Sequence, residues 1–210
     1  MQTATRPTEI LSSEHRVIEH VLDCLDVLAQ RAQKDGTLDT KSAAEALEVV
    51  STFADTCHHM KEENVLFVRM QQRGFPGHIG PIAIMLQDHE TGRERVRGMR
   101  AALARHEKGD KSAAKDFAES AFGYTELLRE HIGKEDQVLF PMAEACFSEE
   151  DRAEVLAGFA EKESKDLGAG THERMLRMVD DLMERLCVSK EARASVSKHS
   201  CGHGGCGHHA

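Results

Sequence analysis

A ten-residue stretch of this chain occurs twice, and the duplication constrains the fold more than any other feature of the sequence. Residues 58–67 read HHMKEENVLF and residues 131–140 read HIGKEDQVLF, with six positions identical at an offset of 73 residues. The offset aligns His58 with His131 and Glu62 with Glu135. A His and a Glu four positions apart lie on one face of an α-helix. The sequence therefore predicts two helices that present the same pair.

Both copies lie within long segments that have the apolar spacing of amphipathic helices. Positions that step by three and four share one helical face. Four such stripes occur: Leu11, His15, Ile18, Leu22, Leu25 and Ala29; Leu47, Val50, Ala54, His58, Glu62 and Val65; Ile82, Met85, His89, Gly92, Val96, Met99 and Leu103; Phe117, Ala121, Tyr124, Leu128, His131, Glu135, Val138 and Met142.

Short turn sequences separate the four stripes, at 35–42 (DGTLDTKS), 73–81 (RGFPGHIGP) and 108–112 (KGDKS). The first turn offers Asp39 or Thr40 as a helix cap. Long helices with short connections predict an all-α protein built on an antiparallel up-down four-helix bundle. We expect the bundle at residues 1–147, a helical extension packed on it at 148–188, and a flexible, disordered tail at 189–210.

Composition narrows the class of protein. The net charge of −9 makes nucleic acid an unsuitable partner. No apolar run approaches the ~20 residues of a membrane span, and the first residues lack the apolar segment of a signal peptide. We therefore expect a cytoplasmic protein without a membrane partner. In such a protein we expect Cys24, Cys57, Cys146 and Cys187, which lie among apolar helical residues, to be buried, reduced thiols.

The inward His and Glu residues predict a metal site. An ionised carboxylate inside a bundle is costly unless a cation balances it. The other two helices each supply one inward histidine, and the spacing is 43 residues from His15 to His58 and 42 from His89 to His131. The chain thus resembles two copies of one hairpin around a pseudo-two-fold axis. The predicted ligands are His15, His58, Glu62, His89, His131 and Glu135.

This donor set suits two iron or manganese ions, since a lone zinc ion needs only four ligands. A single histidine on an apolar face is usually a core residue, but four of them on four helices favour ligation. His59 and Glu63 form a competing pair, which we set aside because His59 aligns with Ile132. The acids beside the ligands in sequence, Glu14, Asp88 and Glu130, are expected to be solvated charges.

The segments SSEHRVIEHVL, CHHMKEENVLF, MLQDHETGRERV and LREHIGKEDQVLFPMAE resemble the motifs of hemerythrin-like, HHE cation-binding proteins. The resemblance covers residues ~8–145. It implies a four-helix bundle with a non-haem diiron centre held by the six residues above. The oxygen-carrying hemerythrins have two histidines one turn apart on the third helix, whereas His89 has Met85 and Arg93 as its neighbours. The missing imidazole implies an open iron position for O2, peroxide or nitric oxide.

Three further features of the sequence have two readings each. Tyr124 is either a core aromatic residue or a hydrogen-bond donor or ligand at the open iron position. His172 is either a surface residue or the missing imidazole, supplied by the extension. The Cys/His-rich tail binds zinc, nickel or copper either specifically or adventitiously, through His199, Cys201, His203, Cys206, His208 and His209.

Three functions follow from these features. The first is a redox enzyme or scavenger that uses the open iron position. The second is an iron or oxygen sensor whose C-terminal helices pass a change to a protein partner or to a second copy of the chain. The third is a metal-handling protein with the tail as a donor or acceptor arm.

Overall fold

The computed structural model describes residues 6–166, 168 and 170–189, and no strand occurs among them. The helical segments, in chain order, are α1 (Pro7–Asp35), α2 (Thr40–Val49), η1 (Val50–His59), η2 (Glu62–Leu66), α3 (Phe67–Gln72), α4 (Gly80–Glu107), α5 (Ala113–Lys134), η3 (Glu135–Leu139), α6 (Phe140–Cys146), α7 (Glu149–Asp166) and α8 (Thr171–Leu186). The segments from α2 to α3 form one continuous rod, and so do those from α5 to α6.

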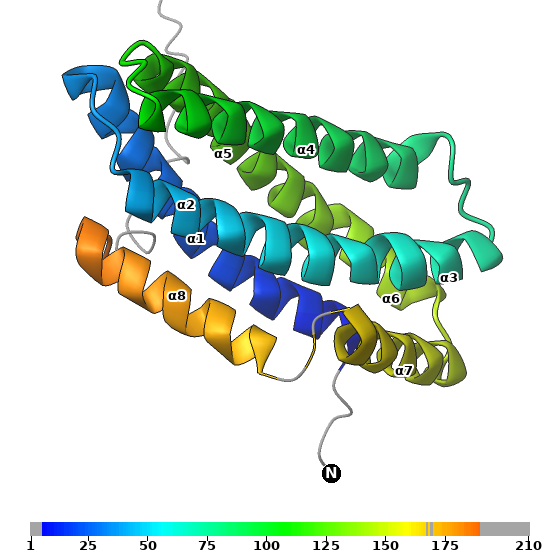
Figure 1. The fold of residues 1–210 in the computed structure, drawn as a ribbon. Helices are drawn as coiled ribbons and strands as arrows, with labels where there is room; N and C mark the ends of the chain where they lie inside the picture. The colour runs from blue at the N-terminus through cyan, green and yellow to red at the C-terminus, as the bar shows by residue number, and fades with distance from the viewer. Residues whose placement is uncertain (1–5, 167, 169, 190–210) are drawn as a thin grey trace, which may run out of the picture.

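The predicted all-α bundle is confirmed. Its four rods are α1, α2–α3, α4 and α5–α6, which lie alongside one another (Figure 1). The rods begin and end where the turn sequences predict. Asp39 caps α2 by accepting a hydrogen bond from Ser42 N at 3.1 Å, and Gly36 ends α1 in the left-handed conformation.

The two C-terminal helices pack against the bundle (Figure 1). The apolar face of α8 joins the core formed with α1 and α2, through Met175, Val179, Leu182, Met183 and Leu186. Helix α7 packs with Val155 and Phe159 against residues of η2 and α3. The boundaries of the expected three-part division stay a prediction, and the Cys/His-rich tail lies outside the described residues.

Three segments of the bundle are π-helical, with i→i+5 hydrogen bonds that widen the turn. Two of them, η2 and η3, begin at Glu62 and Glu135 and therefore occupy matching places in the repeat. The wider turn shifts the inward face by one residue. The predicted inward position Val138 is 50% exposed, whereas Leu139 is 1% exposed. The prediction for Val138 is wrong because it assumed an uninterrupted α-helix.

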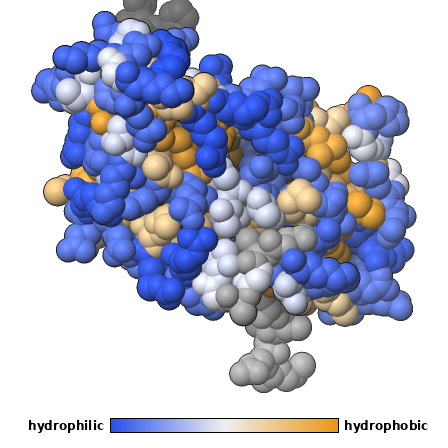
Figure 2. Space-filling view, in the orientation of Figure 1, coloured by the Kyte–Doolittle hydropathy of each residue, from blue (hydrophilic) through white to orange (hydrophobic). Residues whose placement is uncertain are grey.

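Hydrophilic side chains cover most of the face in Figure 2, with hydrophobic ones scattered between them. Among the described residues, no helix has the length and apolar character needed to cross a membrane.

Cys24 and Cys57 are buried as expected, but Cys146 is only half-buried and Cys187 is exposed. Cys187 lies just past the end of α8, where the chain leaves the core.

Candidate metal centre

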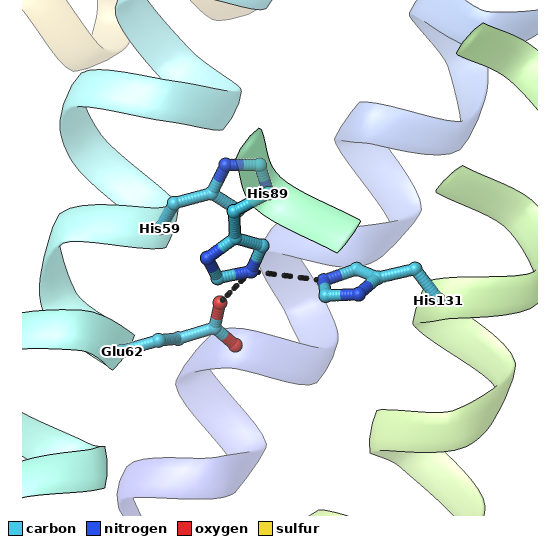
Figure 3. Close-up of side chains that lie close together, drawn as sticks. All are labelled: His59, Glu62, His89 and His131. Atoms are coloured by element: carbon cyan, nitrogen blue, oxygen red, sulfur yellow. Dashed lines mark hydrogen bonds and ion pairs between the residues drawn. The ribbon is translucent and has the colours of Figure 1, made fainter. Parts of the chain in front are cut away.

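The four rods bring seven buried side chains together, and these form two overlapping groups. His59, Glu62, His89 and His131 offer donor atoms within 4.8 Å of one another, and so do His15, His58, Glu62 and Glu135. Figure 3 shows the first group, in which His59 and Glu62 come from the second rod, His89 from α4 and His131 from α5. All six residues predicted from the sequence lie in this cluster, and their role as ligands stays a prediction.

The two glutamates lie between the groups. Glu62 Oε1 is 3.5 Å from His58 Nε2, and its Oε2 is 3.5 Å from His89 Nε2. Glu135 Oε2 is 3.2 Å from His15 Nε2 and 3.3 Å from His131 Nε2. Each carboxylate therefore faces one imidazole of each group. Carboxylates placed in this way could offer oxygen donors to both groups.

His59 is the member that the sequence argument missed. His59 was set aside because its counterpart in the repeat is Ile132. In the structure the π-helical η1 ends at His59, which is 3% exposed and stacks on His89 with ring centroids 3.9 Å apart. The signal in the sequence was the pair His58-His59 itself. The fifth imidazole thus comes from the second helix, not the third.

Most donor atoms of the cluster lack ordinary partners, although Nε2 of His89 and Nε2 of His131 lie 3.1 Å apart. Among the described residues, no hydrogen bond reaches Nε2 of His15 or His58, either ring nitrogen of His59, or the carboxylate oxygens of Glu62 and Glu135. Buried polar atoms are normally hydrogen-bonded. A set of unpaired nitrogen and carboxylate lone pairs that converge on two points fits metal ions, and the five imidazoles and two carboxylates suit iron or manganese.

Carboxylates face the other side of every ring. The Nδ1 atoms of the five histidines lie near acidic oxygens: His15 to Asp136 at 2.9 Å, His58 to Glu14 at 3.0 Å, His89 to Glu63 at 2.7 Å, His131 to Asp88 at 3.4 Å and His59 to Asp55 at 3.5 Å. Such contacts orient an imidazole and leave its Nε2 for a metal. The expectation that Glu14 and Asp88 are solvated charges is therefore wrong.

The contacts of these carboxylates follow the repeat. Glu14 meets His58 and Lys61, and Asp88 meets the matching His131 and Lys134. Glu63 and Asp136 also match at the offset of 73, and each reaches a histidine of the opposite hairpin. This reciprocity is what a pseudo-two-fold axis requires. Only the pair Asp55–His59 breaks it, since the corresponding positions hold Leu128 and Ile132.

Electrostatics favour a cation at the centre. Burial lowers the pKa of His58, His59 and His89 below 6.5, which keeps their rings neutral and able to ligate. Burial raises the pKa of Glu62 well above 4.5, and the charge of Glu135 raises it further. Without a cation, these two carboxylates cannot both be ionised at low cost. Bound cations would remove that conflict.

Of the two further candidates, Tyr124 and His172, only Tyr124 lies beside the cluster. Tyr124 is 2% exposed and shares a cavity wall with His59 and His89. Burial raises its pKa, so the hydroxyl stays protonated and suits a hydrogen-bond donor rather than a phenolate ligand. His172 packs on Phe53 and lies 3.7 Å from Glu163, outside both donor groups. The reading of His172 as the fifth imidazole is wrong, because His172 belongs to neither donor group, whereas His59 belongs to one.

The fold and the cluster together define a metal-binding four-helix bundle, and the comparisons give its family. A family model described as the hemerythrin HHE cation binding domain matches residues 6–143. The chain belongs to this family. Similar proteins include the uncharacterized protein Rv1995 of Mycobacterium tuberculosis and the uncharacterized protein Mb2018 of Mycobacterium bovis. Each is 22% identical over 180 residues, which cover 86% of this chain and 70% of the relative. No solved structure matches the chain significantly.

Proposed function

We propose that the protein holds two non-haem iron ions, or manganese in their place, and that it binds or reacts with O2, peroxide or nitric oxide. One observation carries the proposal. The two oxygens of Glu62 face different imidazoles, His58 and His89, which belong to different donor groups. A single ion would leave one of those groups without a cation, whereas two ions use every donor of the cluster.

The proposed ions have unequal ligand sets. His59, His89 and His131 would hold one ion, and His15, His58 and Glu135 would hold the other, with Glu62 common to both groups. The ion near His15 and His58 would have one imidazole fewer than the other, so we place the open position there. This differs from the sequence argument, which tied the open position to a missing histidine on the third helix.

The residues of the chain set the conditions for that chemistry. Bound iron would supply an electrophilic, redox-active centre. The acids at Nδ1 fix the orientation of the imidazoles and strengthen them as donors. The buried apolar wall, including Phe140, which stacks on His15 with ring centroids 5.4 Å apart, excludes bulk water. The protonated Tyr124 hydroxyl is available as a hydrogen-bond donor on the side of His59.

Metal analysis and an absorption spectrum of the aerobically purified protein test the proposal. We expect about two iron or manganese ions per chain and, with iron, near-ultraviolet absorption typical of a bridged diferric centre. Stopped-flow mixing of the reduced protein with O2, peroxide or nitric oxide then separates reversible binding from turnover. A metal content that saturates at one ion per chain would reject the proposal. So would a reaction no faster than that of free iron.

A sensor function is the second candidate, and a contact of α7 favours it. The ammonium group of Lys61 lies 2.6 Å from Glu14, which holds His58, and 3.3 Å from Glu163 of α7. A change at the centre would reach the C-terminal helices through this chain of charges. Hydrogen exchange in α7 and α8, measured with and without metal and ligand, tests it. Exchange that is the same in all states would leave the sensor function without support.

A further inference from the structure

A cavity of about 200 Å³ lies between η1 and α4, beside the metal centre. Its walls are formed by η1 and α4, which run side by side as the cyan and green segments of Figure 1, and Tyr124 of α5 also lines it. The lining residues are Val50, Ser51, Asp55, His59, His89, Arg93, Val96, Arg97, Arg100 and Tyr124. Two histidines of the centre, His59 and His89, therefore form part of the lining.

The cavity is larger than a diatomic ligand needs. An engineered cavity of about 150 Å³ in another protein holds benzene. The space beside His59 therefore accepts an organic molecule of about eight non-hydrogen atoms. Val50 and Val96 supply the apolar part of the wall, and they come from the two opposing helices. A ligand with a short apolar body fits between them.

The outer part of the cavity carries a cation without an acidic partner. Arg93 is held by Asp55 at 2.9 Å and Glu63 at 2.7 Å, and Arg97 is held by Glu90 at 2.9 Å. Arg100 differs, since it donates to the neutral Ser51 Oγ at 2.7 Å and Leu47 O at 3.3 Å. Among the described residues, no carboxylate forms an ion pair with Arg100. A guanidinium of this kind suits a carboxylate ligand.

The inner part of the cavity carries a hydroxyl without a partner. Tyr124 is 2% exposed, and within the described part of the chain its hydroxyl takes part in no hydrogen bond. The hydroxyl oxygen is not among the buried polar atoms that lack a partner, so it is accessible from the cavity. Because Tyr124 lines the cavity, an acceptor on a bound molecule would satisfy it.

We propose that this cavity binds a small organic carboxylate, whose acid group pairs with Arg100 and whose far end presents a hydrogen-bond acceptor to Tyr124. The inference goes beyond the proposed function, because none of these contacts depends on which ions occupy the centre. A molecule held in this place lies against His59 and His89, so its far end is presented to the metal centre. A keto acid such as 4-oxopentanoate, with a carboxylate at one end and a carbonyl near the other, is a simple ligand of this class.

Titration calorimetry with the full chain, as purified, tests the proposal with three probes: 4-oxopentanoate, pentanoate and methyl 4-oxopentanoate. The keto acid carries both groups, the fatty acid lacks the acceptor, and the ester lacks the charge. We expect 4-oxopentanoate to bind at least about tenfold more tightly than the ester, because a charged hydrogen bond contributes about 1.5–3 kcal/mol.

Variants separate the two contacts. Arg100→Gln should weaken the binding of 4-oxopentanoate about tenfold. Arg105 lies on the same helix and pairs with Asp110 outside the cavity, so Arg105→Gln should leave that affinity unchanged. Tyr124→Phe should weaken the binding of 4-oxopentanoate but not that of pentanoate. Equal affinity for acid and ester, or equal effects of the two arginine variants, would overturn the proposal. Metal content measured on each sample shows whether the centre itself has failed.

Discussion

Lys61 and Glu14 form a buried ion pair, with Nζ 2.6 Å from Oε1, beside the metal centre. The lysine is 1% exposed and the glutamate 4%, and the other oxygen of Glu14 lies 3.0 Å from His58 Nδ1. The same arrangement recurs in the second half of the repeat as Lys134, Asp88 and His131, but there Lys134 is 41% exposed. The repeat thus offers an internal comparison between a buried and an exposed copy of one ion pair.

We expect Lys61→Met to lower the free energy of unfolding by about 3–5 kcal/mol, because it leaves the Glu14 carboxylate buried without its cation. Lys134→Met should cost no more than about 1 kcal/mol, since exposed pairs contribute little. Urea unfolding of the metal-free proteins at neutral pH measures both. Similar losses in the two variants would show that burial does not distinguish the pairs.

The same substitution should weaken metal binding, because Glu14 would no longer be held against the ring of His58. Losing a group that orients a ligand typically reduces affinity 10–100-fold. Competition with a chelator measures the affinity of Lys61→Met against that of the unmodified chain. If the two chains hold metal equally well, the contact of Glu14 with His58 does not orient the ligand.

His59→Ile should reduce the metal content from about two ions per chain to about one, because it removes an imidazole from one donor group and leaves the other group intact. The substitution gives residue 59 the type found at its counterpart, Ile132. His172→Ala is the control, since His172 lies outside both groups. Metal analysis after dialysis decides the matter, and an unchanged content in His59→Ile would remove His59 from the ligand set.

The bundle and six members of the cluster could be predicted because their signals are periodic and duplicated. Apolar residues at steps of three and four defined the helices, and the repeat defined His58, Glu62, His131 and Glu135. His59 could not be predicted by the same logic, because it is the place where the two halves differ and where η1 departs from α-helical geometry. Glu14 was misread because it adjoins His15 in sequence, whereas its partner is His58 across a helix interface.

Asp151 should make the stability of the chain depend on pH in acid. It accepts hydrogen bonds from Arg73 Nη2 at 2.7 Å and from Ser148 N at 2.8 Å, and these contacts anchor the start of α7. The bond from Arg73 lowers the pKa of Asp151 below its ordinary value of 3.8. A lowered pKa means that the contribution to stability is present above pH 3.8 and is lost as the pH falls below it.

We therefore expect Asp151→Asn to have a lower urea midpoint than the unmodified chain at pH 7, and the difference to shrink below about pH 4. Asp116→Asn is the control, because Asp116 pairs with Arg105 on the surface, where each side chain is about half exposed. Unfolding curves at a series of pH values give the comparison. A difference that stays constant into acid would show that the charge of Asp151 does not contribute.

The π-helical turn η3 predicts a reversal in the cost of two neighbouring truncations. In an uninterrupted α-helix Val138 would face the core, but the structure buries Leu139 and exposes Val138. Leu139→Ala should therefore lower the free energy of unfolding by about 2–5 kcal/mol, as for other buried leucines. Val138→Ala should change it by no more than about 0.5 kcal/mol.

Urea unfolding of the metal-free variants measures these costs without a contribution from bound ions. The order of the two values is the informative quantity, because the two registers predict opposite orders. A larger loss for Val138→Ala would mean that the segment after Glu135 continues as an ordinary α-helix. That outcome would also weaken the reading of η2, which occupies the matching place after Glu62 and buries Leu66 in the same way.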